Sequence, residues 1–211
     1  MHYPRELAPD AYEGLAAPIE GRTIRLVPLA EHHAEKLRVA FADSDLWGWS
    51  LVSQPPPTTR EGAAAWLRDA FAQAHARTQV PLAIETLGGE LAGTTRYLDL
   101  RWFDGGVEIG HTMVFAPFRR THVNTEAKYL LLRRAFDEVR VARVALKTDA
   151  RNQRSRAAIA RIGAKFEGIL RCYQRRYNEE IRDTAFFSIT FQEWPAVRAA
   201  LEARLDRTPS W

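Results

Sequence analysis

Polar side chains gather where a predicted strand gives way to a helix, between Val144 and Gly168. Val144 and Leu146 alternate with smaller or polar neighbours, as expected of a strand. Asn152 then stands where a helix N-cap is expected, with Ser155 in the first turn. Strand ends and free N–H groups of a helix start converge at such points, where α/β folds bind ligands. We therefore expect chemistry here, although helix capping alone would also explain Asn152.

Arginines are frequent on both sides of this stretch. A guanidinium makes bidentate contacts with phosphate, so these side chains indicate either a phosphate-bearing ligand or an ordinary solvated basic surface. The arginines concerned are Arg119, Arg120, Arg133, Arg134, Arg151, Arg154, Arg156 and Arg161.

One carboxylate interrupts an otherwise apolar strand. In the segment V-E-I-G-H-T, Glu108 stands at the start of the strand. Partial burial would raise its pKa toward the range in which a general base works. The alternative is an exposed carboxylate at a strand end, or one half of an ion pair.

Composition limits the class of protein. The chain has 211 residues, of which 46% are hydrophobic, which predicts one domain (21–211) after an N-terminal extension (1–20) laid on the surface. The net charge of +4 is small, and the sequence has no long run of basic residues. No nucleic-acid partner is therefore expected. The sequence shows neither a membrane-spanning apolar run nor a signal peptide, which predicts a cytoplasmic protein without a membrane partner. Cys172 is the single cysteine and the histidines are scattered, so no metal site is expected.

Hydrophobic periodicity gives the order of the elements. Three strands linked by tight turns form an antiparallel meander, and the next strand follows a helix long enough to make a parallel pair. The predicted strands are 23–28, 80–85, 91–100, 107–115, one beginning at Val144, 165–177 and 181–190. The predicted helices are 29–42, 58–76, 123–139, one after Asn152, and 193–204.

This order of elements resembles the GNAT family of acyl-CoA-dependent N-acyltransferases, and within it the RimJ/RimL-like branch that includes ribosomal-protein N-terminal acetyltransferases. The resemblance covers roughly residues 21–194. Its most specific motifs are V-E-I-G at 107–110, N-T-E-A-K-Y-L-L-L at 124–132, L-K-T-D-A-R-N-Q-R-S at 146–155, I-G-A-K-F-E-G at 162–168 and R-D-T-A-F-F-S-I at 182–189.

The resemblance implies a fold and a reaction. The fold would be α+β with α/β/α layers: a mixed, mostly antiparallel sheet of about seven strands, a splayed parallel pair, and helices on both faces. The reaction would move an acetyl group from acetyl-CoA to a primary amine, by direct transfer in a ternary complex and without a metal. The acceptor would be a protein N-terminal α-amine or a small molecule. A homodimer through the sheet or the terminal hairpin is compatible with the sequence.

The resemblance also assigns the donor site. The pantetheine arm would lie between the strands of Val107 and Val144, with oxyanion donors among the backbone N–H groups of Met113, Val114 and Phe115. Lys128 would approach a phosphate from the following helix, unless it is an ordinary solvated lysine. Arg120 and His122 stand where the family's phosphate loop has glycines. The pyrophosphate would lie over Arg119, Arg120, Thr121, His122, Val123, Asn124 and Thr125.

By the same resemblance, Asn152 contacts the pantetheine arm beside Arg156, and Ser155 protonates the departing thiolate. Tyr173 is the alternative acid, and packing is the simpler explanation for it.

On the acceptor side, the resemblance places Trp47 and Trp49 in the loop over the amine, although most such aromatics are core residues. Asp183 would line the acceptor pocket or form a salt bridge with Arg182.

The acceptor's own pKa bears on its identity. An α-amine has a reference pKa near 8 and a lysine side chain one near 10.4, so their neutral fractions at pH 7 differ by roughly two orders of magnitude. A site with one modest base therefore suits an α-amine or a small amine better than lysine. The alternative function is a catalytically degenerate acyl-CoA-binding regulatory module.

Overall fold

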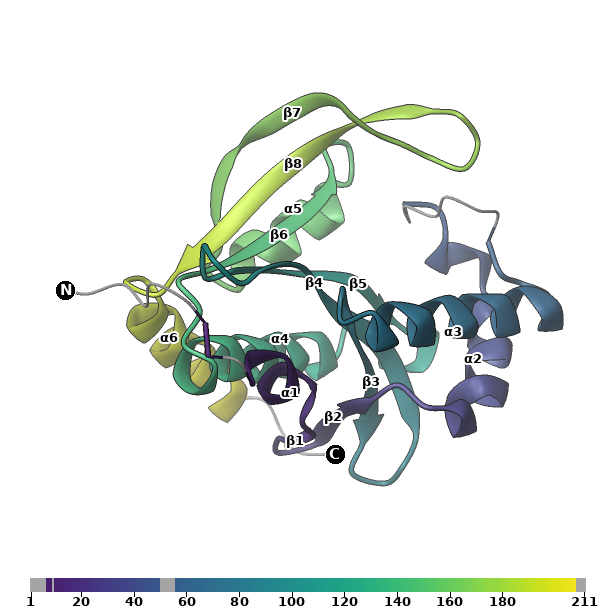
Figure 1. Cartoon of the computed structure of the whole chain (residues 1–211), viewed down its shortest axis with the longest axis horizontal. Helices are drawn as coiled ribbons and strands as arrows, with labels where there is room; N and C mark the ends of the chain where they lie inside the picture. The colour runs from purple at the N-terminus through teal and green to yellow at the C-terminus, as the bar shows by residue number, and fades with distance from the viewer. Residues whose placement is uncertain (1–6, 9, 50–55, 208–211) are drawn as a thin grey trace.

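A computed structural model describes residues 7–8, 10–49 and 56–207 of the chain. Eight strands form one mixed sheet in the order β1-β2-β3-β4-β5-β6-β8-β7 (Figure 1). The strands are β1 (Ile19–Glu20), β2 (Ile24–Pro28), β3 (Val80–Thr86), β4 (Leu91–Arg101), β5 (Gly106–Val114), β6 (Arg143–Asp149), β7 (Lys165–Arg175) and β8 (Ile181–Thr190). The α-helices are α1 (Ala11–Ala16), α2 (Ala34–Phe41), α3 (Arg60–His75), α4 (Val123–Arg133), α5 (Gln153–Arg161) and α6 (Trp194–Asp206).

Helices cover the two faces of the sheet unequally. On one face, Leu37 of α2 and Leu67 of α3 pack against side chains of the β2–β5 half, such as Ala83 and Met113. On the opposite face, α1, α4, α5 and α6 share the larger core with the inward residues of nearly every strand. None of the described helices is long and apolar enough to span a membrane.

The parallel strands β5 and β6 pair over a short distance and then separate. Their register runs from Gly106 opposite Arg143 to Glu108 opposite Ala145, and the remainder of β5 has no partner in β6. A bulge in β5 lies just beyond, where the register with β4 shifts and His111 has a φ of 48°. A bulge bends and twists its strand. The splayed parallel pair predicted from the family resemblance is therefore present, with Glu108 at its vertex.

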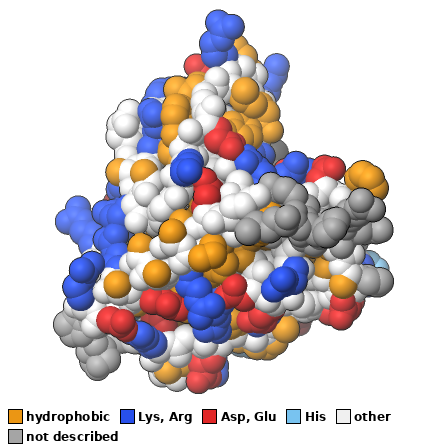
Figure 2. Space-filling view, turned by 90° about the vertical axis from the view of Figure 1, so that its left-hand side faces the viewer, with side chains coloured by type: hydrophobic (Ala, Val, Ile, Leu, Met, Phe, Trp, Pro, Cys, Tyr) orange, Lys and Arg blue, Asp and Glu red, His pale blue; other side chains and the backbone are white. Residues whose placement is uncertain are grey.

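The β7–β8 hairpin projects from the body of the protein. Strand β8 pairs with β6, which leaves β7 at the edge of the sheet. Large apolar side chains on this edge are exposed, among them Phe166, Ile169 and Leu170. Figure 2 shows hydrophobic and basic side chains together on the projecting upper part of the molecule.

The segment before Gly21 is part of the core, contrary to the predicted surface extension. Leu15 of α1 is almost completely buried, and β1 adds an edge strand to the sheet. Arg134 fixes this segment by donating hydrogen bonds to the carbonyls of Gly14 (2.7 Å), Ala17 (2.6 Å) and Pro18 (2.9 Å). Because these contacts span more than 100 residues, the short local pattern could not reveal them.

The other helices and strands agree with the predicted order, apart from details at their ends. The predicted helix over 123–139 is α-helical to Arg133 and continues as a π-helical turn over Arg134–Glu138. Arg134 lies in that turn, and such turns shift the direction of side chains relative to an α-helix.

Glu126 of α4 joins the helix to the turn before β2. Its carboxylate accepts hydrogen bonds from the backbone N–H groups of Arg22 and Thr23 and from the Thr23 hydroxyl. The side chain of Glu126 is buried and the three hydrogen bonds are partly buried, so losing the acceptor leaves these donors only partly compensated.

We expect Glu126→Ala to lower the free energy of unfolding by about 2–3 kcal/mol, because it leaves these donors without an acceptor. Urea denaturation followed by circular dichroism measures the change. The exposed carboxylate of Glu90 provides the control, since Glu90→Ala should change stability by less than about 0.5 kcal/mol. Equal losses in the two variants would contradict the prediction.

Candidate active site

The vertex of the splayed strands holds a buried ion pair. Glu108 is 6% exposed, and its carboxylate Oε2 lies 2.6 Å from Nζ of Lys147 on β6. The two side chains lie on the face of the sheet opposite α5, because Leu146 and Val144 occupy the other face of the same strand. The carboxylate predicted from sequence is therefore neither exposed nor free, but paired.

Burial and charge act in opposite directions on this pair. Burial raises the pKa of Glu108, whereas the Lys147 ammonium and the more distant Arg182 lower it without cancelling the effect. Burial alone would lower the pKa of Lys147, but the ion pair with Glu108 outweighs it and raises that pKa. Asp99 on β4 also raises the pKa of Glu108. The adjacent ammonium favours the ionised carboxylate, and burial makes that carboxylate more basic than an exposed one.

Aromatic rings surround the ammonium. Nζ of Lys147 lies 5.0 Å from the ring centre of Phe186 and 5.5 Å from that of Tyr173. The two rings meet edge to face at 5.1 Å. Tyr173, predicted as an alternative acid, thus lies on the same face as Glu108 and contributes to the surroundings of the pair.

The free end of β5 offers a backbone donor toward β6. The N–H of Phe115 donates to Ala92 O of β4 at 2.9 Å, so it cannot serve as the predicted oxyanion donor. Successive N–H groups of a strand point to opposite edges. Met113 therefore shares the β4 side with Phe115, and the N–H of Val114 faces the side from which β6 has separated.

The start of α4 also presents free donors. The first helical bond is made by Glu126 N–H to His122 O, and the N–H groups of Asn124 and Thr125 donate to no acceptor in the described part of the chain. Val123 N–H donates to Thr121 Oγ1 at 3.3 Å. Such N–H groups and the helix dipole form an anion site.

Arg120 adopts the backbone conformation that glycine would favour. Its φ is 64°, in the left-handed region that costs roughly 1 kcal/mol for a residue with a Cβ. The loop before α4 therefore keeps a glycine-like path at this position despite the substitution.

Two of the arginines proposed for phosphate contact are already engaged. Arg119 donates to Val114 O (3.1 Å) and to Asp43 Oδ2 (2.7 Å), which ties the end of β5 to the loop after α2. Arg156 donates to Ala150 O (3.1 Å) and lies over the ring of Phe166. Their guanidinium groups serve local structure here, a role that sequence proximity to the loop does not reveal.

Lys128 is buried, in contrast to the solvated lysine that was the simpler prediction. Its Nζ donates to Thr112 Oγ1 in the bulge of β5, and Thr112 Oγ1 lies 2.9 Å from Thr95 Oγ1. Burial lowers the pKa of Lys128 to about 7. The side chain is directed at Thr112 and supports the bulge of β5.

Asn152 caps α5 as its sequence position predicted. Its Oδ1 accepts a hydrogen bond from Ser155 N–H at 3.0 Å. The Asn152 amide nitrogen and the Ser155 hydroxyl donate to no acceptor within the described residues. The cap therefore leaves donor capacity at the end of β6.

The chain can now be compared with known proteins. A family model described as an acetyltransferase (GNAT) domain matches residues 23–165. The chain belongs to the GNAT acetyltransferase family. No curated protein matches it in sequence.

Solved structures agree with this assignment. A GCN5-related N-acetyltransferase from Brucella melitensis is 30% identical, with 89% of this chain and 85% of that one covered and a TM-score of 0.81. A candidate acetyltransferase from T. thermophilus is 38% identical, with coverage of 89% and 96% and a TM-score of 0.80. Mycobacterium smegmatis RimJ in complex with CoA-disulfide shares the fold at 20% identity, with coverage of 94% and 99% and a TM-score of 0.81.

Within this GNAT fold, the aromatic residues after α2 have different positions. Trp47 is 5% exposed, donates from Nε1 to Phe41 O (3.0 Å) and belongs to the core between α2 and α3, so it is unavailable to substrate. Trp49 is exposed, and Arg151 lies 5.7 Å from its ring centre. The rest of the predicted acceptor loop, residues 50–55, lies outside the described part.

Asp183 neither pairs with Arg182 nor shares its face of β8. Its Oδ1 accepts a hydrogen bond from Cys172 N–H at 2.8 Å, where β7 bulges and Cys172 has a φ of 52°. Neighbouring side chains in a strand point to opposite faces, which excludes the predicted salt bridge.

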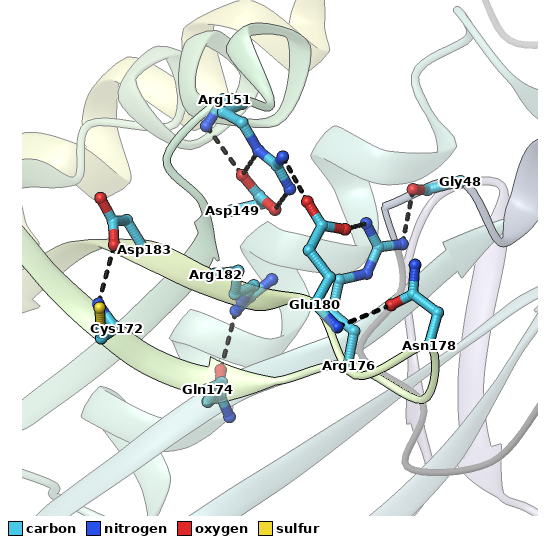
Figure 3. A network of polar contacts seen from close by, with 10 residues as sticks. All are labelled: Gly48, Asp149, Arg151, Cys172, Gln174, Arg176, Asn178, Glu180, Arg182 and Asp183. Atoms are coloured by element: carbon cyan, nitrogen blue, oxygen red, sulfur yellow. Dashed lines mark hydrogen bonds and ion pairs between the residues drawn. The ribbon is translucent and has the colours of Figure 1, made fainter.

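The tip of the β7–β8 hairpin reaches the loop after α2 (Figure 3). Arg176 donates to Gly48 O at 2.8 Å, and Glu180 contacts both Arg176 (3.2 Å) and Arg151 (2.5 Å). Arg151 in turn pairs with Asp149 at 2.9 Å. The hairpin, the end of β6 and the loop after α2 are therefore linked on the same side of the sheet.

One group of possible metal ligands occurs in the described residues, away from this site. His32, His33 and Glu85 bring their ligand atoms together. Ala30 N–H donates to Nδ1 of His33, which leaves Nε2 to donate to Glu85 (3.1 Å), and Glu85 also binds Arg25. The set is a satisfied hydrogen-bond network and gives no reason to infer a metal.

Sequence reasoning missed Lys147 and gave Arg182 only as a partner of Asp183. Lys147 stands in V-A-L-K-T-D, where a lysine interrupts an apolar strand just as Glu108 does. Two opposite charges in neighbouring buried strands were the available signal for this pair.

We expect Lys147→Met to lower the free energy of unfolding at pH 7 by about 3–5 kcal/mol, because it leaves Glu108 buried without its partner. Burial then raises the pKa of Glu108 further, so the folded state binds an extra proton. The deficit should shrink as pH falls toward the usual glutamate range, near 4.3. Denaturant titrations between pH 5 and 7 measure this.

The pair of the exposed Lys165 and the half-buried Glu193 provides the control for Lys147→Met. Lys165→Met should cost less than about 1 kcal/mol. A deficit of Lys147→Met that is the same at every pH would show that lost packing, not the ion pair, is responsible.

Lys128 gives a second pH dependence. Its folded pKa of about 7 is below that of an unfolded lysine, so the unfolded state binds more protons between pH 7 and 10. Wild-type stability should therefore rise relative to Lys128→Met by up to about 1.4 kcal/mol per pH unit in this window. Chemical denaturation at pH 7, 8 and 9 tests it. Lys36→Met, on the surface, should leave the pH dependence of the free energy of unfolding as in the wild type. The same pH dependence in all three proteins would refute the low pKa assigned to Lys128.

Proposed function

We propose that this protein is an acetyl-CoA-dependent N-acetyltransferase that acetylates a primary amine by direct transfer in a ternary complex. The observation that supports it best is the vertex between β5 and β6. There, the buried Glu108–Lys147 pair meets the free edge of β5, toward which the N–H of Val114 points. Membership of the GNAT family implies this general chemistry.

On the donor side, backbone groups would bind coenzyme A. The N–H groups of Asn124 and Thr125 at the start of α4 suit the pyrophosphate, and the left-handed Arg120 keeps the loop open to it. The pantetheine arm would lie between β5 and β6, with the Asn152 amide as a donor along it. The Val114 N–H would bind the thioester oxygen and stabilise the negative charge that develops during attack.

On the acceptor side, Glu108 would take the proton from the attacking ammonium, directly or through a water. Its raised pKa improves it as a base, and Lys147 holds it in place and favours its ionised form. The neutral amine nitrogen then attacks the thioester carbon. The tetrahedral intermediate loses a proton from that nitrogen to solvent and collapses as the C–S bond breaks, which releases the thiolate. Ser155 or Tyr173 would return a proton to that sulfur.

The resemblance to RimJ/RimL-like enzymes favours an α-amine acceptor, either a peptide N-terminus or a small molecule. Neighbours of that kind, such as Mycobacterium smegmatis RimJ, share the fold at low identity. A single base of modest strength also suits an α-amine, because its neutral fraction at pH 7 exceeds that of lysine by roughly two orders of magnitude.

We expect Glu108→Gln to lower turnover by about 10²-fold or more at pH 7 and to leave coenzyme A affinity within about twofold. The measurements are thiol release from acetyl-CoA with a panel of amines, and a thermal shift with coenzyme A. Glu90→Gln removes a surface carboxylate and should retain the wild-type rate.

Each outcome has a distinct meaning. An unchanged rate in Glu108→Gln would remove this residue from the mechanism. Stabilisation by coenzyme A without transfer to any amine would favour the alternative function, a degenerate acyl-CoA-binding regulatory module. If coenzyme A does not stabilise the protein at all, both functions are wrong.

A further inference from the structure

Arg182 on β8 is a buried cation that forms no ion pair within the described residues. The residue is 4% exposed, and the one hydrogen bond that its guanidinium donates within the described part of the chain runs from Nη2 to the neutral Gln174 Oε1 at 2.9 Å (Figure 3). No described carboxylate lies within ion-pair distance of it, and its Nε has no hydrogen-bond partner among the described residues.

The charged groups around Arg182 are, in contrast, matched. Lys147 pairs with Glu108, and the tip network joins Arg151 and Arg176 to two carboxylates. Among these cations, Arg182 is the one for which no described carboxylate lies within ion-pair distance. The cations are Lys147, Arg151, Arg176 and Arg182, and the carboxylates are Glu108, Asp149 and Glu180.

A second buried polar group on the same face lacks a partner. Thr184 follows Arg182 by two residues in β8, so the two side chains point to the same side of the sheet. Thr184 is completely buried, and its Oγ1 makes no hydrogen bond within the described chain. Two adjacent unsatisfied groups are unusual, because buried polar groups are nearly always paired.

An arginine in this position remains charged. Burial lowers the pKa of Arg182 to about 10, which still leaves the guanidinium protonated at neutral pH. An uncompensated buried charge is costly, and a carboxylate held by a guanidinium is the usual compensation. The charge of Asp149, and less strongly that of Glu108, raises the pKa of Arg182 without forming an ion pair with it, and Arg182 in turn lowers the pKa of Glu108. An anion bound by Arg182 would therefore lie near the base.

We propose that Arg182, assisted by Thr184, binds a carboxylate of the acceptor, so that the acceptor class is amines that carry a carboxylate close to the amino group, such as α-amino acids. This inference rests on the proposed acetyltransferase function. Under it, the carboxylate fixes one end of the acceptor while the amine at the other end meets Glu108.

The test compares matched ligands that differ in this charge. N-acetylglycine, N-acetylalanine, N-acetylglutamate and N-acetylphenylalanine, each beside its C-terminal amide, are titrated by thermal shift and NMR in the presence of coenzyme A. The corresponding free amino acids and their amides are assayed as acceptors with acetyl-CoA. The proteins are the wild type, Arg182→Gln, Arg182→Lys and the control Arg171→Gln, an exposed arginine of β7.

We expect at least one acid to bind the wild type and Arg171→Gln roughly tenfold or more tightly than its amide, the range of a hydrogen-bonded charge. Arg182→Gln should abolish this difference, and Arg182→Lys should recover part of it and show that the fold tolerates substitution. The same preference should appear in kcat/KM.

Equal binding of every acid and its amide to the wild type would overturn the proposal, as would a preference that survives Arg182→Gln. A loss of coenzyme A affinity in Arg182→Gln, with the acid preference intact, would assign Arg182 to the donor. Preferential binding of an acid without transfer to any amine would instead contradict the acetyltransferase function and leave the carboxylate site supported.

Discussion

The short pairing between β5 and β6 is the constraint on which the rest of the site depends. The two strands are joined from Gly106–Arg143 to Glu108–Ala145 and then part, because the bulge around His111 turns β5 away. Helix α4 makes this parallel pairing possible, since it returns the chain to the same end of the sheet. Longer pairing would consume the free edge of β5, and shorter pairing would not bury Glu108.

Buried charge at this vertex links stability to chemistry. An apolar pair in place of Glu108 and Lys147 would pack without the cost of desolvation, which buried ion pairs often fail to recover. A catalytic base, however, needs a carboxylate that is both ionised and more basic than one in water. Pairing with Lys147 provides the first property and burial the second. Lys128 and Arg182 are also charged groups whose pKa is lowered by burial. These four residues lie beside the vertex or the bulge.

Local sequence patterns correctly predicted the features that depend mainly on neighbouring residues. Periodicity located the helices and strands, the length of the crossover predicted the parallel pair, and Asn152 caps α5 as its position indicated. The predictions were wrong where contacts with residues distant in the sequence determine the position of a side chain. Trp47 is in the core because Phe41 and α3 surround it, and Asp183 binds the backbone at the Cys172 bulge instead of pairing with Arg182. Lys147 was missed because its role, as the ion-pair partner of Glu108, depends on which strand lies next to β6.

The two sides of the vertex differ in the kind of group that they present. The side proposed for the donor consists of backbone N–H groups, at Val114 and at the start of α4, which any residue except proline can supply. That explains how Arg120 and His122 can occupy glycine positions: Arg120 takes the left-handed conformation, and the direction of the following N–H groups does not depend on side-chain identity. The side proposed for the acceptor consists of side chains on β5, β6 and β8. Selectivity among acceptors can therefore change by substitution on those strands while the donor site is retained.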